Sequence, residues 1–214
     1  MLMSSGLYNE LINEGYLVKH SEENRKVESP GWKVIMPEPI PFISYPYEWS
    51  FGMLKDAALL TLNIQKIALK HGMSLKDASA FNIHFFKGKP ILIDTLSFEE
   101  YEEGKPWVAY KQFVEHFLNP LAVMAYTDVK LNRISQVFLD GIPLDIASHM
   151  LPTRSKLNLS LLFHIHAHAK AQKKNSGKQL GAKLNKRNFG KRALMGMLDS
   201  LENCIRKLSW SPAG

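Results

Sequence analysis

The sequence predicts an α+β fold that is mainly helical, and three observations support this. Residues 52–71 carry a broad apolar face at helical spacing and form the clearest helix of the chain. Residues 81–86 and 90–93 are apolar, β-favouring runs separated by Lys-Gly-Lys, which predicts a hairpin. From residue 107 onward the apolar spacing is helical again. We therefore expect a few short strands in the first half and helices in the second.

Composition indicates a soluble globular protein. The chain has 214 residues, 45% of them hydrophobic, enough for one large core. No stretch approaches the roughly 18 to 20 apolar residues of a membrane span, and the amino terminus does not read as a signal peptide. The single cysteine, Cys204, excludes an internal disulfide and a multi-cysteine metal site. These features predict a cytoplasmic protein without a membrane partner.

The net charge of +7 comes from one tract. Residues 170–192 hold nine basic and no acidic residues, whereas the rest of the chain has 18 basic against 20 acidic residues. Gly177 and Gly181 disfavour a helix in this tract, and Phe189 is its only aromatic residue. We expect a linker. Binding of nucleic acid phosphates is the alternative, although binders of single strands usually interleave aromatic residues with charge.

The first half is predicted as a short helix, a loop, two strands, a long helix and the hairpin. The ranges are 5–17 for the helix, which ends near Gly15, 20–31 for the loop, 32–36 and 42–45 for the strands, and 52–71 for the long helix. An acidic loop follows the hairpin and is closed by Lys105 and Pro106.

The second half is predicted as a series of helices. These cover 107–118, a stretch to 126 after a break at Asn119 and Pro120, 131–139, 143–150 with Pro143 as first residue, 156–170 and 191–208. The predicted division is 1–31 for an amino-terminal helix and loop, 32–169 for the main lobe, 170–192 for the basic linker and 193–214 for a helix and tail.

Three polar residues around the hairpin form the candidate site. Asp77 is suited to orient or deprotonate an attacking hydroxyl, while Asn82 and Asp94 are suited to hold Mg²⁺ against nucleotide phosphates. The hairpin should bring Asn82 and Asp94 close together. The alternative is structural, with Asp77 in a helix-to-loop connection, Asn82 in a turn and Asp94 as a cap.

The run HIHAHAK is a second candidate, for a metal site. A helix would place only His164 and His168 on one face, and no Glu completes the H-E-x-x-H pattern. A zinc site normally needs a third protein ligand. We therefore expect His164, His166 and His168 to be partly exposed helix residues.

The order of elements resembles the lower lobe of the protein kinase and aminoglycoside phosphotransferase superfamily. The resemblance implies a kinase-like C-lobe with a reduced or missing N-lobe, with Asp77 as the catalytic residue and Asn82 and Asp94 as metal ligands. Leu75 and Lys76 stand where the His and Arg of the protein-kinase motif would be, and no G-x-G-x-x-G occurs. We therefore expect nucleotide binding to be weak or absent, as in a pseudokinase.

Three phrases are more specific: YPYEWSFGMLKDAAL, LKDASAFNIHFFKGKPILIDTLSFE and GKPWVAYKQFVEHFLNPLA. Together they resemble the amino-terminal region of bacterial class I SAM-dependent methyltransferases, a group that includes nodulation-associated proteins. The resemblance implies an accessory region, substrate-binding or regulatory, of a longer transferase. Its partner would be the methyltransferase domain or another protein, and SAM would belong to the full-length protein and not to this chain.

Two further functions stay open. One is a small-molecule phosphotransferase that uses Asp77 as base, with Asn82 and Asp94 on Mg²⁺ and ATP as cofactor. The other is a nucleic-acid-binding module that uses residues 170–192.

Overall fold

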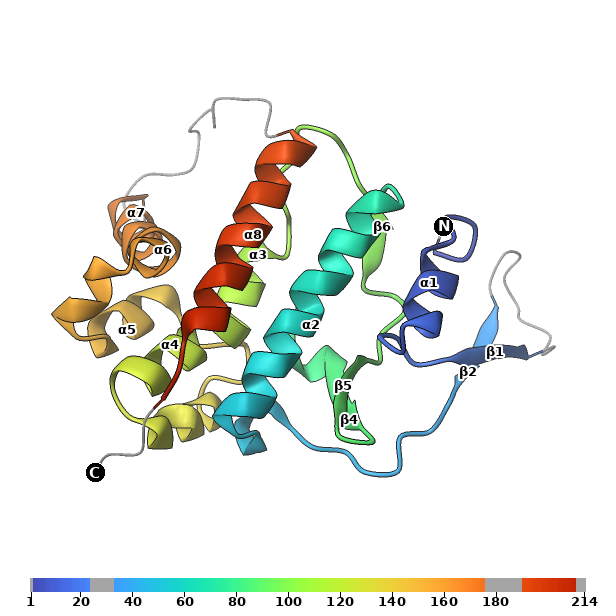
Figure 1. Ribbon diagram of the computed structural model, residues 1–214, viewed down its shortest axis with the longest axis horizontal. Helices are drawn as coiled ribbons and strands as arrows, with labels where there is room; N and C mark the ends of the chain where they lie inside the picture. The colour runs from blue at the N-terminus through green and yellow to red at the C-terminus, as the bar shows by residue number, and fades with distance from the viewer. Residues whose placement is uncertain (1, 24–32, 176–189, 211–214) are drawn as a thin grey trace.

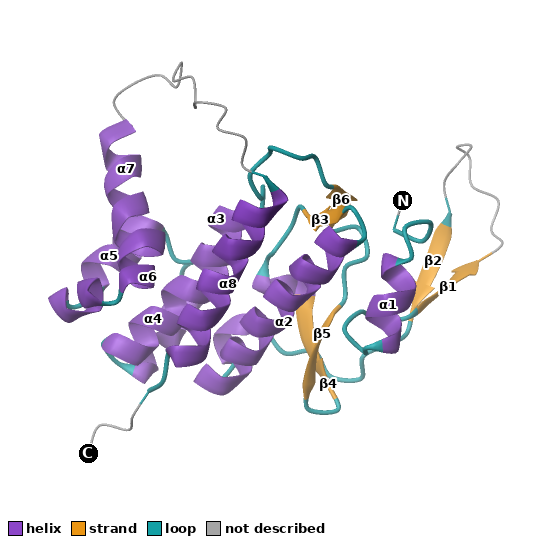
Figure 2. Ribbon diagram, turned by 45° about the horizontal axis from the view of Figure 1, so that its top comes forward, coloured by secondary structure: helices purple, strands orange, loops and turns teal. Residues whose placement is uncertain are grey.

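The computed structural model describes residues 2–23, 33–175 and 190–210. Two long helices, α2 (Phe51–Lys70) and α8 (Lys191–Lys207), lie side by side and run in opposite directions at its centre (Figure 1). Most of the short helices lie on one side of this pair, and the small antiparallel sheets lie on the other together with the amino-terminal helix (Figure 2). The described part of the chain is therefore mainly helical.

The other elements are short. The α-helices are α1 (Leu7–Asn13), α3 (Tyr110–Phe113), α4 (Asn119–Tyr126), α5 (Leu144–Met150), α6 (Leu159–Leu161) and α7 (His168–Asn175). The 3₁₀ segments are η1 (Pro46–Glu48), η2 (Ala80–Asn82), η4 (Val129–Gln136) and η5 (Thr153–Leu157), and the π segments are η3 (Val114–Leu118) and η6 (Leu162–Ala167). The strands pair as β1 (His20–Glu23) with β2 (Val34–Pro37), β3 (Met73–Leu75) with β6 (Phe98–Glu100), and β4 (Ile83–Phe86) with β5 (Lys89–Leu92).

The helix predicted at residues 52–71 is confirmed as α2. Ser50 begins it by accepting a hydrogen bond from the Met53 amide, and Gly72, at φ 70°, ends it. Its inner face packs on four fully buried residues of α8, which are Leu194, Leu198, Leu201 and Ile205. Lys66 of α2 also pairs with Asp199 and Glu202 of α8, each at 2.5 Å.

The predicted hairpin is confirmed as β4 and β5. Phe86 faces Lys89 across a two-residue turn, and both turn residues have positive φ, 51° for Lys87 and 77° for Gly88. Two positive φ values define the type I′ turn, whose twist matches the twist of antiparallel strands. The hairpin is tied to the amino-terminal segment because the Leu92 amide donates to the Tyr16 carbonyl at 2.8 Å.

The predicted helix break at Asn119 and Pro120 is wrong, because α3, η3 and α4 form one continuous helical stretch. The Asn119 amide bonds to the Val114 carbonyl in the i→i−5 manner of a π segment. Pro120 follows directly and has no N–H with which to continue this pattern to the Glu115 carbonyl. The Glu115 carbonyl accepts instead from the Ile142 amide at 2.9 Å.

Four other predicted ranges need correction. Residues 42–45 form no strand, and with Phe42 75% exposed they have no partner strand to pair with. Residues 20–23, predicted as loop, form β1, and residues 98–100 of the predicted acidic loop form β6. Residues 129–136 form a 3₁₀ segment where an ordinary helix was predicted over 131–139.

Both ends of the predicted linker 170–192 are helical where the structure describes them. Lys170 continues α7, and Lys191 is the first residue of α8. Residues 176–189 of the tract lie outside the described residues.

Candidate functional site

Asn82 and Asp94 meet at one buried hydroxyl group. Ser97, only 1% exposed, donates its proton to Asp94 Oδ2 at 2.6 Å and accepts from Asn82 Nδ2 at 3.1 Å. The Ile93 amide also donates to the Asn82 carbonyl at 2.9 Å. The hairpin therefore brings the two predicted metal ligands together, with Ser97 between them.

Asp94 is held by its own turn as well. Its second carboxylate oxygen, Oδ1, accepts from the Leu96 amide at 2.8 Å. Both oxygens are thus hydrogen-bonded to the segment that follows, in the manner of an Asx turn. Ser97 was missed by the sequence reasoning, because its contact with Asp94 depends on how the turn after Asp94 folds back.

Asp77 lies in a separate turn and makes a similar local contact. Its Oδ1 accepts from the Ser79 amide at 2.9 Å, and Ser79 in turn caps the 3₁₀ segment η2. Its charge acts on His116, whose imidazole is buried. Burial lowers the pKa of His116, and the carboxylates of Asp77 and Asp140 oppose that lowering. His116 is a second residue near the site that sequence reasoning missed.

Three long side chains fix the backbone that carries Asp77. Gln65, fully buried in α2, accepts from the Leu75 amide at 2.7 Å. Trp107 Nε1 donates to the Leu75 carbonyl at 2.7 Å, and Gln112 Oε1 accepts from the Ala78 amide at 2.7 Å. Because a buried unpaired backbone group is costly, these contacts determine the path of the loop.

These residues fit a Mg²⁺ site poorly. Mg²⁺ needs near-octahedral oxygen ligands, usually one or two carboxylates together with phosphates. Asp94 would have to exchange its bonds to Ser97 and Leu96, and Asp77 belongs to another turn. Within residues 2–23, 33–175 and 190–210, no group of three His, Cys, Asp or Glu side chains is arranged to hold a metal ion.

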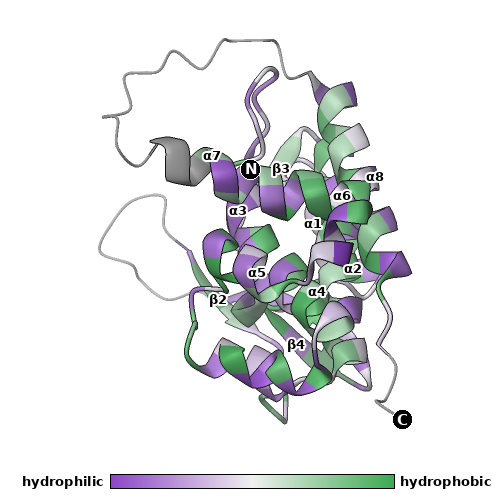
Figure 3. Ribbon diagram, turned by 90° about the vertical axis from the view of Figure 1, so that its left-hand side faces the viewer, coloured by the Kyte–Doolittle hydropathy of each residue, from purple (hydrophilic) through white to green (hydrophobic). Residues whose placement is uncertain are grey.

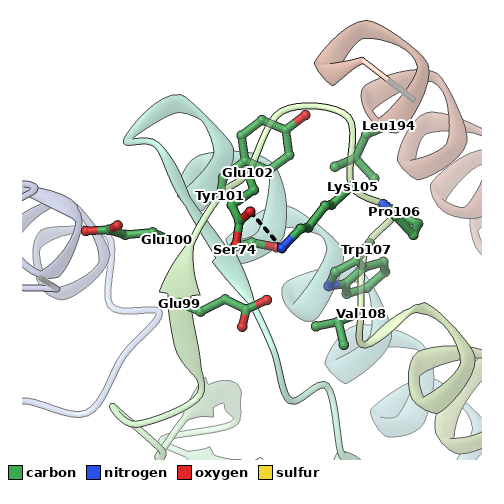
Figure 4. Close-up of a pocket in the computed structure, with 10 residues that line it drawn as sticks. All are labelled: Ser74, Glu99, Glu100, Tyr101, Glu102, Lys105, Pro106, Trp107, Val108 and Leu194. Carbon is green, nitrogen blue, oxygen red and sulfur yellow. Dashed lines mark ion pairs between the residues drawn. The ribbon is translucent and has the colours of Figure 1, made fainter. Parts of the chain in front are cut away.

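A small cavity lies beside strands β3 and β6 (Figure 4). Its volume is about 220 Å³, below the roughly 300 to 1,000 Å³ of most ligand sites. Glu99 points toward the side of Trp107, Glu100 points the opposite way, and Lys105 pairs with Glu102 at 2.6 Å. Asp77, Asn82 and Asp94 do not line it, so it is separate from the hairpin site.

Two of the three histidines of HIHAHAK are less exposed than predicted, while His168 is partly exposed as expected. His164 is 1% exposed and His166 is 7% exposed. Tyr110 Oη lies 2.7 Å from His164 Nδ1, and two serines contact the ring of His166. The prediction of partly exposed residues is wrong for these two, because η6 is covered on two sides: His164 contacts Tyr110 and Ser200, and His166 contacts Ser148 and Ser155.

The fold and the site together define a mainly helical chain with a small hairpin that is followed by a hydrogen-bonded aspartate. The chain is 35% identical over 167 residues to the nodulation protein NoeA of Rhizobium meliloti (strain 1021), a match that covers 76% of the chain. The chain spans 35% of the length of that relative. This similarity confirms the nodulation-associated part of the resemblance, but not the methyltransferase or kinase part.

No protein family model matches the chain, and no solved structure matches it. In the part of the chain that the structure describes, no helix has the length and apolar character needed to cross a membrane.

Proposed function

We propose that this chain is an accessory module, kinase-like in the order of its elements, of a longer methyltransferase-like protein. In this proposal the hairpin has a structural role or helps to bind a substrate. The observation that carries the proposal is the contact of Asn82 and Asp94 through Ser97. In a working phosphotransferase the oxygens of these residues face the metal ion. Here the Asp94 carboxylate is directed at its own turn.

The similarity to NoeA supports the idea of a module. About two thirds of that relative lies outside the part that the chain spans, since the chain spans 35% of it. The remaining part is where we place the SAM-binding domain. The accessory region would then bind the acceptor substrate or regulate the transferase, and SAM would bind elsewhere.

Isothermal titration calorimetry with the 214-residue chain tests the proposal. We expect no binding of SAM and none of Mg²⁺·ATP at micromolar concentrations. Micromolar binding of SAM would overturn the proposal that SAM binds outside this chain. Micromolar binding of Mg²⁺·ATP that is lost in Asp94→Asn and retained in the exposed control Asp56→Asn would instead establish the phosphotransferase alternative.

A further inference from the structure

His166 lies between two serines, and the hydrogen bonds determine which atom carries each proton. Ser155 is fully buried and donates its one proton to the Pro152 carbonyl at 2.7 Å. Its oxygen lies 2.9 Å from His166 Nε2, so it must accept a proton from that nitrogen. His166 is therefore the Nε2–H tautomer, and its Nδ1 is an acceptor. Ser148 Oγ, 2.8 Å from Nδ1, must donate.

Of the three hydrogen-bonded residues Ser148, His166 and Ser155, two face a cavity. Ser148 and His166 line a space of about 600 Å³ between α5, η5, η6 and α7, while Ser155 lies behind them. Helices α5 and α7 lie side by side at this place (Figure 3). A half-buried hydroxyl, a base within hydrogen-bonding distance and a third group that orients the base are the signature of an activated nucleophile.

The other walls of the cavity indicate what it would accept. Leu162, Ala167 and Ala169 supply apolar surface. Lys156 and Lys170 supply ammonium groups, beside one carboxylate, that of Asp145. The volume lies within the range of small-molecule sites. Apolar walls with two cations suit an uncharged ester whose carbonyl oxygen becomes negative during attack.

We propose that Ser148 is a nucleophile, His166 its general base and Ser155 the residue that positions the base, in a site that hydrolyses carboxylic esters with a short apolar group. The Ser148 Oγ–carbon bond forms as the hydroxyl proton passes to His166 Nδ1. The ester carbon–oxygen bond then breaks, and the departing alcohol oxygen takes that proton. Water repeats the sequence and releases the acid and free Ser148. The Nε2–H bond to Ser155 persists throughout.

The environment of His166 suits this role. Burial lowers the pKa of the imidazole, and Lys156 lowers it further. The ring therefore stays neutral near pH 7, which a general base requires.

Labelling with diisopropyl fluorophosphate, read by peptide mass spectrometry, tests the proposal. We expect an adduct on Ser148, no adduct at this position in Ser148→Ala, and at least a hundredfold slower labelling in His166→Gln. The matched control Ser160→Ala, whose hydroxyl contacts Ser200, should label as the wild type does. Absence of an adduct on Ser148 in the folded wild type, or equal labelling rates in His166→Gln, overturns the proposal.

Ser155→Ala separates positioning from folding. We expect ¹⁵N NMR of the His166 ring to show loss of the fixed Nε2–H tautomer, with slower hydrolysis of p-nitrophenyl acetate at unchanged KM. If Ser155→Ala retains both the Nε2–H tautomer of His166 and the rate of hydrolysis, Ser155 does not position the base.

Discussion

Ser97 is the residue on which the geometry of the hairpin base depends. Its hydroxyl both accepts from Asn82 and donates to Asp94, in a position 1% exposed to solvent. Ser97→Ala removes one hydrogen bond to each of the half-buried Asn82 and Asp94, and at about 0.5 to 1.5 kcal/mol for each bond the loss is about 1 to 3 kcal/mol. We expect the free energy of unfolding, measured with urea, to fall by that amount. Ser21→Ala, at an exposed site on β1, is the control and should change it by less than about 0.5 kcal/mol.

His164 should make the stability of the chain depend on pH. Burial lowers its pKa to about 4, whereas an unfolded histidine titrates near about 6.5. As the pH falls through this window, the unfolded chain binds the proton first. The contribution is therefore complete above about pH 6.5 and is lost toward about pH 4, on the order of 3 kcal/mol.

Other histidines act on the same window. Burial also lowers the pKa of four of them, so they change stability in the same direction; these are His84, His116, His166 and His168. The hydrogen bond that His71 donates to the Glu10 carboxylate raises the pKa of His71, so its contribution is present at low pH and lost as the pH rises. Urea unfolding at about pH 7 and about pH 5 tests the role of His164. The difference in the free energy of unfolding between the two pH values should be smaller in His164→Gln than in the wild type. The control His149→Gln, at an exposed site, should leave that difference unchanged. An unchanged difference in His164→Gln would contradict the assignment.

At the scale of elements, α8 offers a matched pair of substitutions. Leu198 is fully buried against α2, and Leu198→Ala should cost about 2 to 5 kcal/mol because it leaves a cavity. Gly196 is exposed in the same helix, and an added Cβ meets no atom within 4 Å. Gly196→Ala should therefore stabilise by about 0.5 to 1 kcal/mol. Thermal unfolding measures both, and a loss of stability in Gly196→Ala would show that α8 is packed differently.

Elements with a strong local pattern were predictable. Helix α2 has an apolar face, a serine cap and a terminal glycine, and the hairpin has a Lys-Gly turn between β-favouring runs. The π segments η3 and η6 were not predictable, because π geometry depends on tertiary contacts. One such contact in η3 is the hydrogen bond from the Ile142 amide to the Glu115 carbonyl. The strand predicted at 42–45 failed because β-propensity does not supply a partner strand.

The candidate site was predictable in position more than in chemistry. Hairpin geometry follows from local sequence, so the approach of Asn82 to Asp94 could be foreseen. The interposed Ser97 could not, because it depends on how the turn after Asp94 folds back. The electrostatic interaction between Asp77 and the buried His116 joins residues far apart in the sequence, and no spacing rule indicates it.

At the scale of the whole molecule, the chain is similar to one part of a longer relative. It matches NoeA over 76% of its own length but spans 35% of that protein. Helices α2 and α8 pack against each other in one hydrophobic core that extends from α1 to the end of α8 (Figure 1). Strand β5 of the hairpin packs on α2 and so belongs to the same core.

We propose that the Asp94 carboxylate holds the hairpin and does not hold a nucleotide-bound metal ion. The most direct test is urea unfolding of the wild type and Asp94→Asn, each with and without Mg²⁺·ATP. The account predicts that Asp94→Asn lowers the free energy of unfolding by about 1 to 3 kcal/mol and that Mg²⁺·ATP changes neither protein. Stabilisation of the wild type by Mg²⁺·ATP, together with an Asp94→Asn variant as stable as the wild type, would contradict it.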